Sequence, residues 1–404
     1  MIKRELYMSR IRPFIGNDLI KVLTGIRRSG KSVMLNLIKE ELKENGIEET
    51  QFISFNFEAM SNAAYCTAQA LHKEVTHRAE HIPGKVYLFF DEIQEVEDWE
   101  KCVNSFRMEL DCDIYITGSN AKLLSGELAT YLAGRYVEFI IYPFSFGEFS
   151  ELYATVYPEA MPTQRFQAYL TTGGMPYLAN LRFAEEPGRQ YLEDLYNSVV
   201  LKDIVKRNNV RDVDLLERII AYITANIATT FSATSITKFF KNEGRTVSAE
   251  TVLNYIRYCL DAYLFFRIKR QDLQGKQLLA TNEKYYIADH GIREAVFGGN
   301  MRDINLILEN MVFMELLRRG YTVTVGRTAE KEVDFVCEKK DQKLYVQVTY
   351  LLAAQETVKR EFGVYDSIRD NFPKYVVSMD DLDMSRNGIK HRNIRDFLLM
   401  PRWD

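Results

Sequence analysis

One glycine-rich segment near the N-terminus constrains the fold more than any other feature of the chain. Residues 25–32 read GIRRSGKS and fit the pattern G-x-x-x-x-G-K-[ST] without a mismatch. The apolar run at residues 19–24 predicts a strand before this segment, and the apolar spacing of residues 33–42 predicts a helix after it. A strand, a glycine-rich turn and a helix in this order are typical of a phosphate-binding loop.

The residues of this segment suit a bound phosphate. Glycines let the backbone curl so that successive N–H groups point inward, and the helix N-terminus adds a partial positive charge. We expect phosphate contacts from Gly25, Ser29 and Gly30. Lys31 is expected to reach the β- and γ-phosphate oxygens, and the hydroxyl of Ser32 to bind Mg²⁺. The alternative is a glycine turn that happens to carry lysine and serine.

A second motif ends in two carboxylates. The apolar run at residues 85–90 predicts a buried parallel strand, so Asp91 is expected at the strand end where α/β sheets bind ligands. Asp91 would hold Mg²⁺ through water, and Glu92 is the candidate general base. The alternative is that the pair caps the next helix.

A third strand, predicted over residues 113–118, ends before two small polar residues. Ser119 is the first choice for a sensor of the γ-phosphate and Asn120 the second. Either residue could instead belong to a turn.

These motifs, together with residues 132–136 and 142–149, resemble the AAA-type ATPase domain of a large prokaryotic family. In that family the ATPase is fused to a C-terminal domain of unknown function called DUF4143, and residues 172–177 resemble a turn in its lid region. The resemblance covers nearly the whole chain and implies ATP as the nucleotide. It also implies that Arg135 reaches a γ-phosphate in its own subunit or in a neighbour through self-association; a structural salt bridge is the alternative.

Length and composition fit a globular chain of several domains. The 404 residues are too many for one ordinary core and predict about three domains. There is no apolar run near 18 residues and no signal-peptide core, so no membrane span is expected. The five cysteines are scattered without a C-x-x-C pair, which predicts reduced thiols in a cytoplasmic protein.

The periodicity predicts an α/β chain in four parts. Residues 1–150 are expected to form a P-loop NTPase domain with a parallel sheet of the AAA/ASCE type, and residues 151–212 a helical lid or connector. Residues 213–290 are expected to form a winged helix–turn–helix, and residues 295–404 a small α/β domain that is nuclease-like.

The winged-helix prediction depends on three helical patterns followed by two strands, which are joined through residues 274–276. Between residues 232 and 293 there are ten Lys/Arg and six Asp/Glu, a local balance of +4 in a chain of net charge −4. This basic segment favours a local contact with double-stranded DNA, and a protein-docking or packing module is the alternative. The candidate DNA contacts are Asn254, Arg257, Lys269 and Arg270.

The C-terminal part resembles the PD-(D/E)xK nuclease core. Glu309 on a helix and Asp334 in the next hairpin stand where an active member holds a divalent metal. The third motif should supply a carboxylate and a lysine on one strand face, but Gln347 and Thr349 occupy these positions. Glutamine has no charge and threonine has no ammonium, so we expect a vestigial site with little or no activity.

The sequence thus predicts a cytoplasmic, Mg²⁺-dependent ATPase whose nucleotide state controls its C-terminal modules, with DNA as a candidate partner. Two other classes stay open. One is an ATP-regulated DNA nuclease of a defence system, which a migrated lysine such as Lys343 or Lys359 would favour. The other is a signalling switch that binds protein only.

Overall fold

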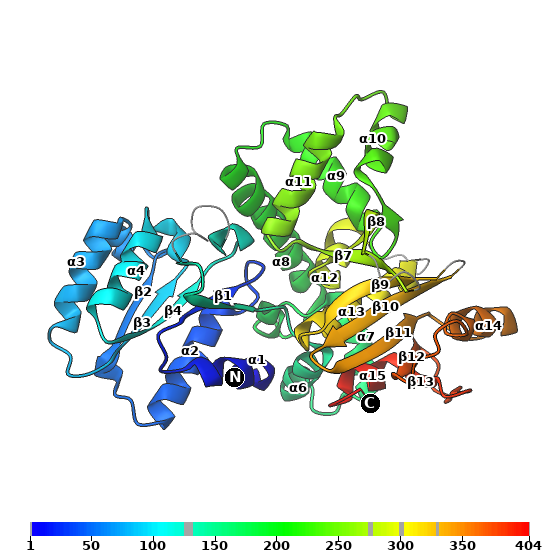
Figure 1. Cartoon of the computed structure of the whole chain (residues 1–404), viewed down its shortest axis with the longest axis horizontal. Helices are drawn as coiled ribbons and strands as arrows, with labels where there is room; N and C mark the ends of the chain where they lie inside the picture. Colours follow the sequence, from blue (N-terminus) through cyan, green and yellow to red (C-terminus); the bar gives the residue numbers. More distant parts are fainter. Residues whose placement is uncertain (1, 125–131, 274–277, 299–302, 329–330, 404) are drawn as a thin grey trace. The chain divides into compact units, whose positions relative to one another are not determined.

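The structure is a computed structural model. It describes residues 2–124, 132–273, 278–298, 303–328 and 331–403 (Figure 1). The turn expected at residues 274–276 lies outside these ranges. No helix among the described residues is both long and apolar enough to cross a membrane.

The chain divides into two compact units. The first consists of Met1–Tyr142 and Asp261–Tyr263, and the second of Pro143–Leu260 and Leu264–Asp404. The domain boundary expected at residue 150 therefore falls inside the second unit, within a helix.

A parallel sheet forms the centre of the first unit, with strand order β2-β3-β4-β1-β5 among the described residues. The strands are β1 (Ile20–Thr24), β2 (Phe52–Asn56), β3 (Val86–Asp91), β4 (Cys112–Thr117) and β5 (Tyr136–Ile140). All neighbouring strands run parallel, so their C-terminal ends lie along one edge of the sheet. The side chains of β1 and β3 are buried on both faces, which explains why both strands read as continuous apolar runs.

Helices cover both faces of this sheet. They are α1 (Glu5–Ile11), η1 (Arg12–Phe14), α2 (Lys31–Glu44), η2 (Glu49–Gln51), η3 (Met60–Tyr65), α3 (Ala68–Ala79), η4 (Ile93–Glu95), α4 (Trp99–Glu109) and η5 (Ala121–Leu124). Val22, Leu88 and Ile116 share one core with side chains of α3 and α4, such as Val75 and Phe106. The alternate residues of these strands point to the other face, where Lys39 of α2 lies 4.7 Å from the centroid of the Phe89 ring.

Tyr263 belongs to the first unit, although it lies between two elements of the second in the sequence. Its φ of 55° is left-handed, and its side chain is buried. The Tyr263 hydroxyl donates to Glu138 Oε1 at 2.9 Å. The same oxygen accepts from Thr24 Oγ1 at 2.6 Å, so Glu138 on β5 binds both the end of β1 and Tyr263.

A mixed sheet runs through the second unit, with strand order β13-β12-β11-β10-β9-β7-β8-β6 among the described residues. The strands are β6 (Thr230–Phe231), β7 (Phe265–Asp272), β8 (Leu278–Ile287), β9 (Thr322–Arg327), β10 (Glu332–Lys339), β11 (Gln342–Val348), β12 (Lys374–Ser378) and β13 (Lys390–Asn393). The β7–β8 hairpin is antiparallel, and β7 pairs in parallel with β9. Residues 213–290 and 295–404, expected as separate domains, therefore contribute to one sheet.

Helices of the second unit both precede and follow these strands. They are α6 (Phe146–Val156), α7 (Pro162–Thr172), η6 (Pro176–Ala179), α8 (Glu185–Ser198), η7 (Val199–Lys206), α9 (Val213–Ala225), α10 (Ala233–Asn242), α11 (Ala249–Asp261), α12 (His290–Phe297), α13 (Ile304–Arg318), α14 (Gln355–Gly363) and α15 (Ile394–Leu399). The helical patterns expected before the hairpin correspond to α9, α10 and α11 (Figure 1).

The carboxylate of Asp289, just before α12, binds the backbone of Gly174, which follows α7, and of Gly291 in α12. The N–H of Gly174 donates to Asp289 Oδ2 at 2.7 Å, and the N–H of Gly291 donates to Asp289 Oδ1 at 3.0 Å. A Cβ on Gly174 would lie 2.3 Å from the carbonyl oxygen of Phe144, so only glycine fits there. The segment expected as a lid, residues 151–212, is therefore an integral part of the second unit.

Candidate nucleotide-binding site

The glycine-rich segment forms a tight loop between β1 and α2. Gly25 has a φ of 132°, and a Cβ there would lie 2.3 Å from the carbonyl oxygen of Ile141. Gly30 caps α2 with a φ of 99°, and Arg28 between them is left-handed as well. Both glycines are thus required by the backbone, and the loop leads directly into the N-terminus of α2.

Lys31 holds its ammonium group within this loop. The Nζ atom donates to the carbonyl oxygens of Gly25 at 3.1 Å and Ile26 at 3.2 Å, and it lies 3.9 Å from Glu92 Oε1. Ser32 is exposed at the first turn of α2. The Oγ atom of Ser29 is buried and has no hydrogen-bond partner among the described residues. A phosphate oxygen is a group that would suit both this hydroxyl and the ammonium.

Asp91 and Glu92 lie where β3 ends, at the same edge of the sheet as the loop. Asp91 Oδ1 accepts from Thr117 Oγ1 at 2.5 Å, and Asp91 Oδ2 accepts from Asn56 Nδ2 at 3.2 Å. Glu92 has a left-handed φ of 55°, and its N–H donates to Thr117 Oγ1 at 2.9 Å. One threonine hydroxyl therefore fixes both acidic residues, and Asp91 retains oxygen lone pairs of the kind that Mg²⁺ prefers.

Ser119 and Asn120 follow β4, which lies between β3 and β1. Both side chains are buried. Since β1, β3 and β4 are parallel, these two residues belong to the sheet edge that carries Lys31 and the acidic pair.

Arg135 lies at the other edge of the sheet. It precedes β5, whose first residue Tyr136 pairs with Ile20 at the start of β1, whereas the phosphate loop follows the end of β1. Its Nη1 donates to Asn104 Oδ1 on α4 at 2.8 Å. The structure therefore does not bring Arg135 to the phosphate loop of its own chain.

The candidate DNA contacts lie on two elements, α11 and β7, and differ in how exposed they are. On α11, Arg257 is exposed, and its Nη2 donates to Asn254 Oδ1 at 3.2 Å. On β7, Lys269 is exposed, but Arg270 is largely buried, and its Nη2 lies 3.1 Å from Glu332 Oε2. Arg270 is thus committed to an ion pair within the fold.

The four residues of the expected vestigial nuclease site line one cavity of about 450 Å³ in the second unit. Gln347 Oε1 accepts from the N–H of Asp334 at 3.1 Å, and Gln347 Nε2 donates to Glu361 Oε2 at 2.9 Å. A carboxylate could not make the second contact, so position 347 requires an amide. Glu309 and Thr349 complete this part of the lining.

In the arrangement that the structure shows, with a lysine ammonium already beside two of them, these residues do not fit a divalent metal. No group of three or more His, Cys, Asp or Glu side chains within the described ranges is arranged to hold one. Gln347 is used on both sides by protein groups, and Asp334 Oδ2 already accepts from the N–H of Val348 at 2.9 Å. Burial, with Glu309 nearby, raises the pKa of Asp334 well above its ordinary value, which further weakens it as a ligand.

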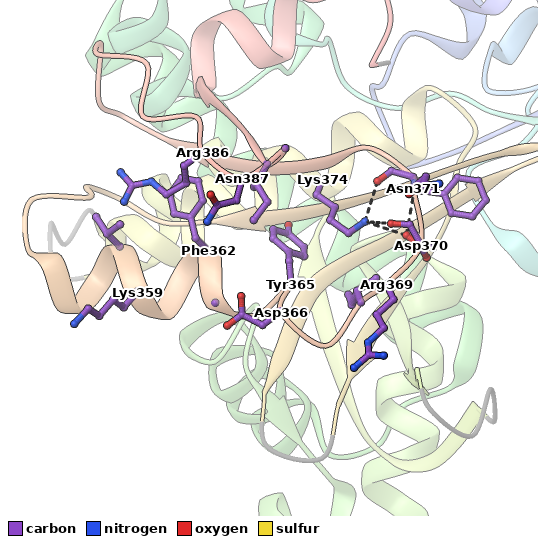
Figure 2. A pocket seen from close by; sticks show the side chains of 16 residues that line it. Lys359, Phe362, Tyr365, Asp366, Arg369, Asp370, Asn371, Lys374, Arg386 and Asn387 are labelled. Carbon is purple, nitrogen blue, oxygen red and sulfur yellow. Dashed lines mark hydrogen bonds and ion pairs between the residues drawn. The ribbon is translucent and has the colours of Figure 1, made fainter.

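The lysines considered for migration lie elsewhere. Lys343 Nζ is 3.3 Å from Glu338 Oε1. Lys359 is exposed on α14 and borders another cavity, of about 610 Å³, where it stands at the opposite end from Asp370 and Lys374 (Figure 2). The lysine that does reach the carboxylates is Lys284 of β8, which the sequence reasoning missed.

Two known proteins are similar in sequence to most of this chain. A protein of Haemophilus influenzae, described as uncharacterized, is 36% identical over 401 residues, which cover 99% of each chain. The chain belongs to the same family as this protein. Another uncharacterized relative, from Methanocaldococcus jannaschii, is 31% identical over 370 residues, which cover 87% of this chain and 79% of the relative.

Two family descriptions match parts of the chain. Residues 17–150 match one described as an AAA domain, so the family carries an AAA-type ATPase domain. Residues 163–303 match a domain of unknown function, DUF8612. The resemblance to DUF4143 is thereby not confirmed.

Solved structures with some likeness include the AMPPCP-bound DnaA of Aquifex aeolicus, at 16% identity and a TM-score of 0.33 over 63% of this chain and 85% of that chain. The Aeropyrum pernix ORC1 protein in complex with DNA is 13% identical, with a TM-score of 0.31 over 72% of this chain and 90% of that chain.

The sequence analysis did not identify three further polar residues at this site, and the first of them is Arg4. Arg4 lies outside the matched AAA domain, yet its Nη1 donates to the carbonyl oxygen of Ser29 at 3.0 Å and its Nη2 to that of Tyr142 at 2.8 Å. Thr117 and Asn56 were missed as well. Their signal was available, because both are polar residues at the C-terminal ends of strands next to β3.

Proposed function

We propose that the protein is a Mg²⁺-dependent ATPase whose site is the C-terminal edge of the first sheet. The observation that carries this proposal is the short distance between Lys31 Nζ and Glu92 Oε1, 3.9 Å, next to Asp91 at the end of β3. Lys31 and the N-terminus of α2 provide positive charge for a triphosphate, and the two acidic residues lie beside it.

Each residue would have a distinct part in the reaction. Lys31 would exchange its bonds to loop carbonyls for bonds to the β- and γ-phosphate oxygens. Ser32 and Asp91 would hold Mg²⁺, which supplies neutralisation of the phosphate charge when it is bound. Glu92 would orient the attacking water and accept its proton, and Ser119 would contact the γ-phosphate.

The AAA domain match supports adenine as the base and ATP as the substrate. Because Arg135 lies away from the loop of its own chain, we propose that it acts on the nucleotide of a neighbouring subunit in a self-associated form. The structure forms no disulfide among the five cysteines, which would fit a reducing cytoplasm.

We also propose that the nucleotide state controls the second unit and that α11 and β7 contact double-stranded DNA there. The order α9, β6, α10, α11, β7, β8 is that of a winged helix–turn–helix. Arg257 and Lys269 are exposed, and Lys269 has no ion pair in the part of the chain that the structure describes. Two exposed cations on a helix and a neighbouring hairpin suit phosphate contacts. A switch that binds protein only is the competing proposal.

ATP turnover with and without duplex DNA tests both proposals. We expect turnover by the wild-type protein, none by Lys31→Ala, and near wild-type turnover by Lys43→Ala, whose lysine lies on the same helix and pairs with the exposed Glu49. Wild-type turnover by Lys31→Ala would show that this loop is not the site.

DNA is expected to stimulate turnover, and retention on DNA should fall steeply with salt. The double variant Arg257→Ala, Lys269→Ala should lose both effects while keeping basal turnover. Absence of any salt-dependent retention in the wild-type protein would favour the protein-only switch and leave the ATPase proposal intact.

A further inference from the structure

Lys284 brings a buried ammonium group to the carboxylates that were expected to hold a metal. Its Nζ lies 3.1 Å from Glu309 Oε1, 3.1 Å from Glu332 Oε1 and 3.7 Å from Asp334 Oδ1. The side chain of Lys284 is 5% exposed. Three carboxylates from α13 and β10 thus share one ammonium, which comes from β8.

Strand β8 supplies a second donor to the same place. The hydroxyl of Tyr286 donates to Glu309 Oε1 at 2.7 Å, and residues 284 and 286 point to the same face of the strand because they are two apart. The Tyr286 ring stacks on Phe313 of α13, with centroids 4.0 Å apart. One oxygen of Glu309 is therefore held by two protein donors that packing keeps in position.

The remaining charges of the cluster have partners of their own. Arg270 Nη2 lies 3.1 Å from Glu332 Oε2, and Arg360 Nη2 lies 2.6 Å from Glu361 Oε1. The ammonium of Lys284 therefore faces three acidic side chains, Glu309, Glu332 and Asp334, whose negative charge favours its protonated form.

We propose that the ammonium of Lys284 takes the place of a divalent metal and holds Glu309, Glu332 and Asp334 together. An ammonium with hydrogen-bonded carboxylate partners offsets their mutual repulsion without any external ion. These ion pairs then connect the β7–β8 hairpin to α13 and β10 and stabilise the second unit without a bound metal.

This inference goes beyond the proposed function, because it concerns what holds the carboxylates of the second unit and not the nucleotide site. It does not depend on ATP turnover, since all of these residues lie in the second unit. Its test is therefore carried out on the full chain without nucleotide.

The test is a titration of the wild-type protein and of Lys284→Gln with Mn²⁺. Calorimetry measures binding, and thermal unfolding measures stability. The wild-type protein is expected to bind no stoichiometric Mn²⁺ at these carboxylates. Lys284→Gln leaves the carboxylates without their cation, so its unfolding temperature should be lower. At about 5 mM Mn²⁺ this variant should bind about one ion per chain and regain at least ~2 °C. Lys343→Gln, which removes a surface lysine, should behave like the wild-type protein.

Two results would overturn the proposal. One is binding of about one Mn²⁺ by the wild-type protein that Asp334→Asn or Glu309→Gln abolishes. The other is a folded Lys284→Gln that gains no Mn²⁺ binding. If Lys284→Gln does not fold, Lys284→Arg keeps the cation and should fold and bind no Mn²⁺ at these carboxylates. Stoichiometric binding by Lys284→Arg that a further Asp334→Asn change abolishes would then reject the idea.

Discussion

Arg4 donates a 3.0 Å hydrogen bond from its guanidinium to the carbonyl oxygen of Ser29, in the middle of the phosphate loop. The same guanidinium binds the carbonyl of Tyr142 at 2.8 Å and lies 4.6 Å from the centroid of the Tyr7 ring. Arg4 is buried and left-handed, with a φ of 47°. Arg4 thus binds a backbone carbonyl of the phosphate loop, so we regard it as a positioning residue for that loop.

Replacement of Arg4 by methionine is expected to loosen the loop, because hydrogen bonds to charged groups contribute about 1.5–3 kcal/mol. The dissociation constant for ATP should rise at least about tenfold, and Arg4→Lys should fall between the two because it cannot bind both carbonyls as a fork. Nucleotide titration by calorimetry measures this. Lys3→Met, at an exposed neighbour, is the matched control. Unchanged affinity in Arg4→Met would remove Arg4 from the site.

Glu92→Gln is expected to retain ATP binding and to lose turnover by about 10²–10⁴-fold, because an amide cannot accept a proton from water. The amide can still contact Gln94, which donates to Glu92 Oε2 at 2.5 Å in the wild-type protein. Single-turnover hydrolysis and binding are measured side by side. Glu95→Gln changes an exposed carboxylate three residues further on and should hydrolyse ATP normally. A Glu92→Gln variant with full turnover would mean that another group activates the water.

Gln347→Glu tests why the third nuclease position carries an amide. The new carboxylate would face Glu361 Oε2, which accepts from Gln347 at 2.9 Å, so repulsion between buried charges should destabilise the second unit by about 2 kcal/mol or more. Urea unfolding followed by circular dichroism measures the loss. Gln355→Glu, an exposed change on α14, is the comparison and should unfold like the wild-type protein. Equal stability of Gln347→Glu would mean that the amide is not required.

The cysteines are expected to be poor nucleophiles in the folded protein. Burial raises the pKa of Cys102 and of Cys112 to about 12 in each case. Since the thiolate is the reactive form, their alkylation at pH 8 should be about 10³-fold slower than that of an ordinary thiol and should rise roughly tenfold per pH unit. Mass spectrometry after iodoacetamide treatment measures each site, and the same chain in urea is the control. Rapid modification of Cys102 in the folded state would contradict its place in the core.

The sequence predicts which residues lie at the C-terminal edge of the first sheet, because local patterns determine their positions. The loop, the acidic pair and Ser119 each come directly after an apolar strand, and parallel strands bring such positions to one edge. The same rule would have included Thr117 and Asn56. Arg4 could not be predicted, since its two contacts lie 25 and 138 residues further along the chain and no local pattern marks it.

The C-terminal cavity shows the limit of reasoning from motif positions. The pattern of Glu309, Asp334, Gln347 and Thr349 predicts residues that do line one cavity, but it carries no information about Lys284. Lys284 comes from β8 because β7 pairs with β9 and makes the hairpin part of the same sheet. That long-range pairing has no periodic signature, so the sequence predicts neither the shared sheet nor the ammonium beside Glu309 and Asp334.

The assignment of Asp261–Tyr263 to the first unit has a topological consequence. The polypeptide passes between the units after Tyr142, after Leu260 and again after Tyr263, so they are tied by three covalent crossings. After a single cut following Tyr142, Tyr263 would remain on the C-terminal fragment, while its hydrogen-bond partner Glu138 would be on the N-terminal fragment. Residues 1–142 expressed alone would lack that tyrosine, and the strand next to the phosphate loop would lose a support that comes from more than 120 residues further along the chain.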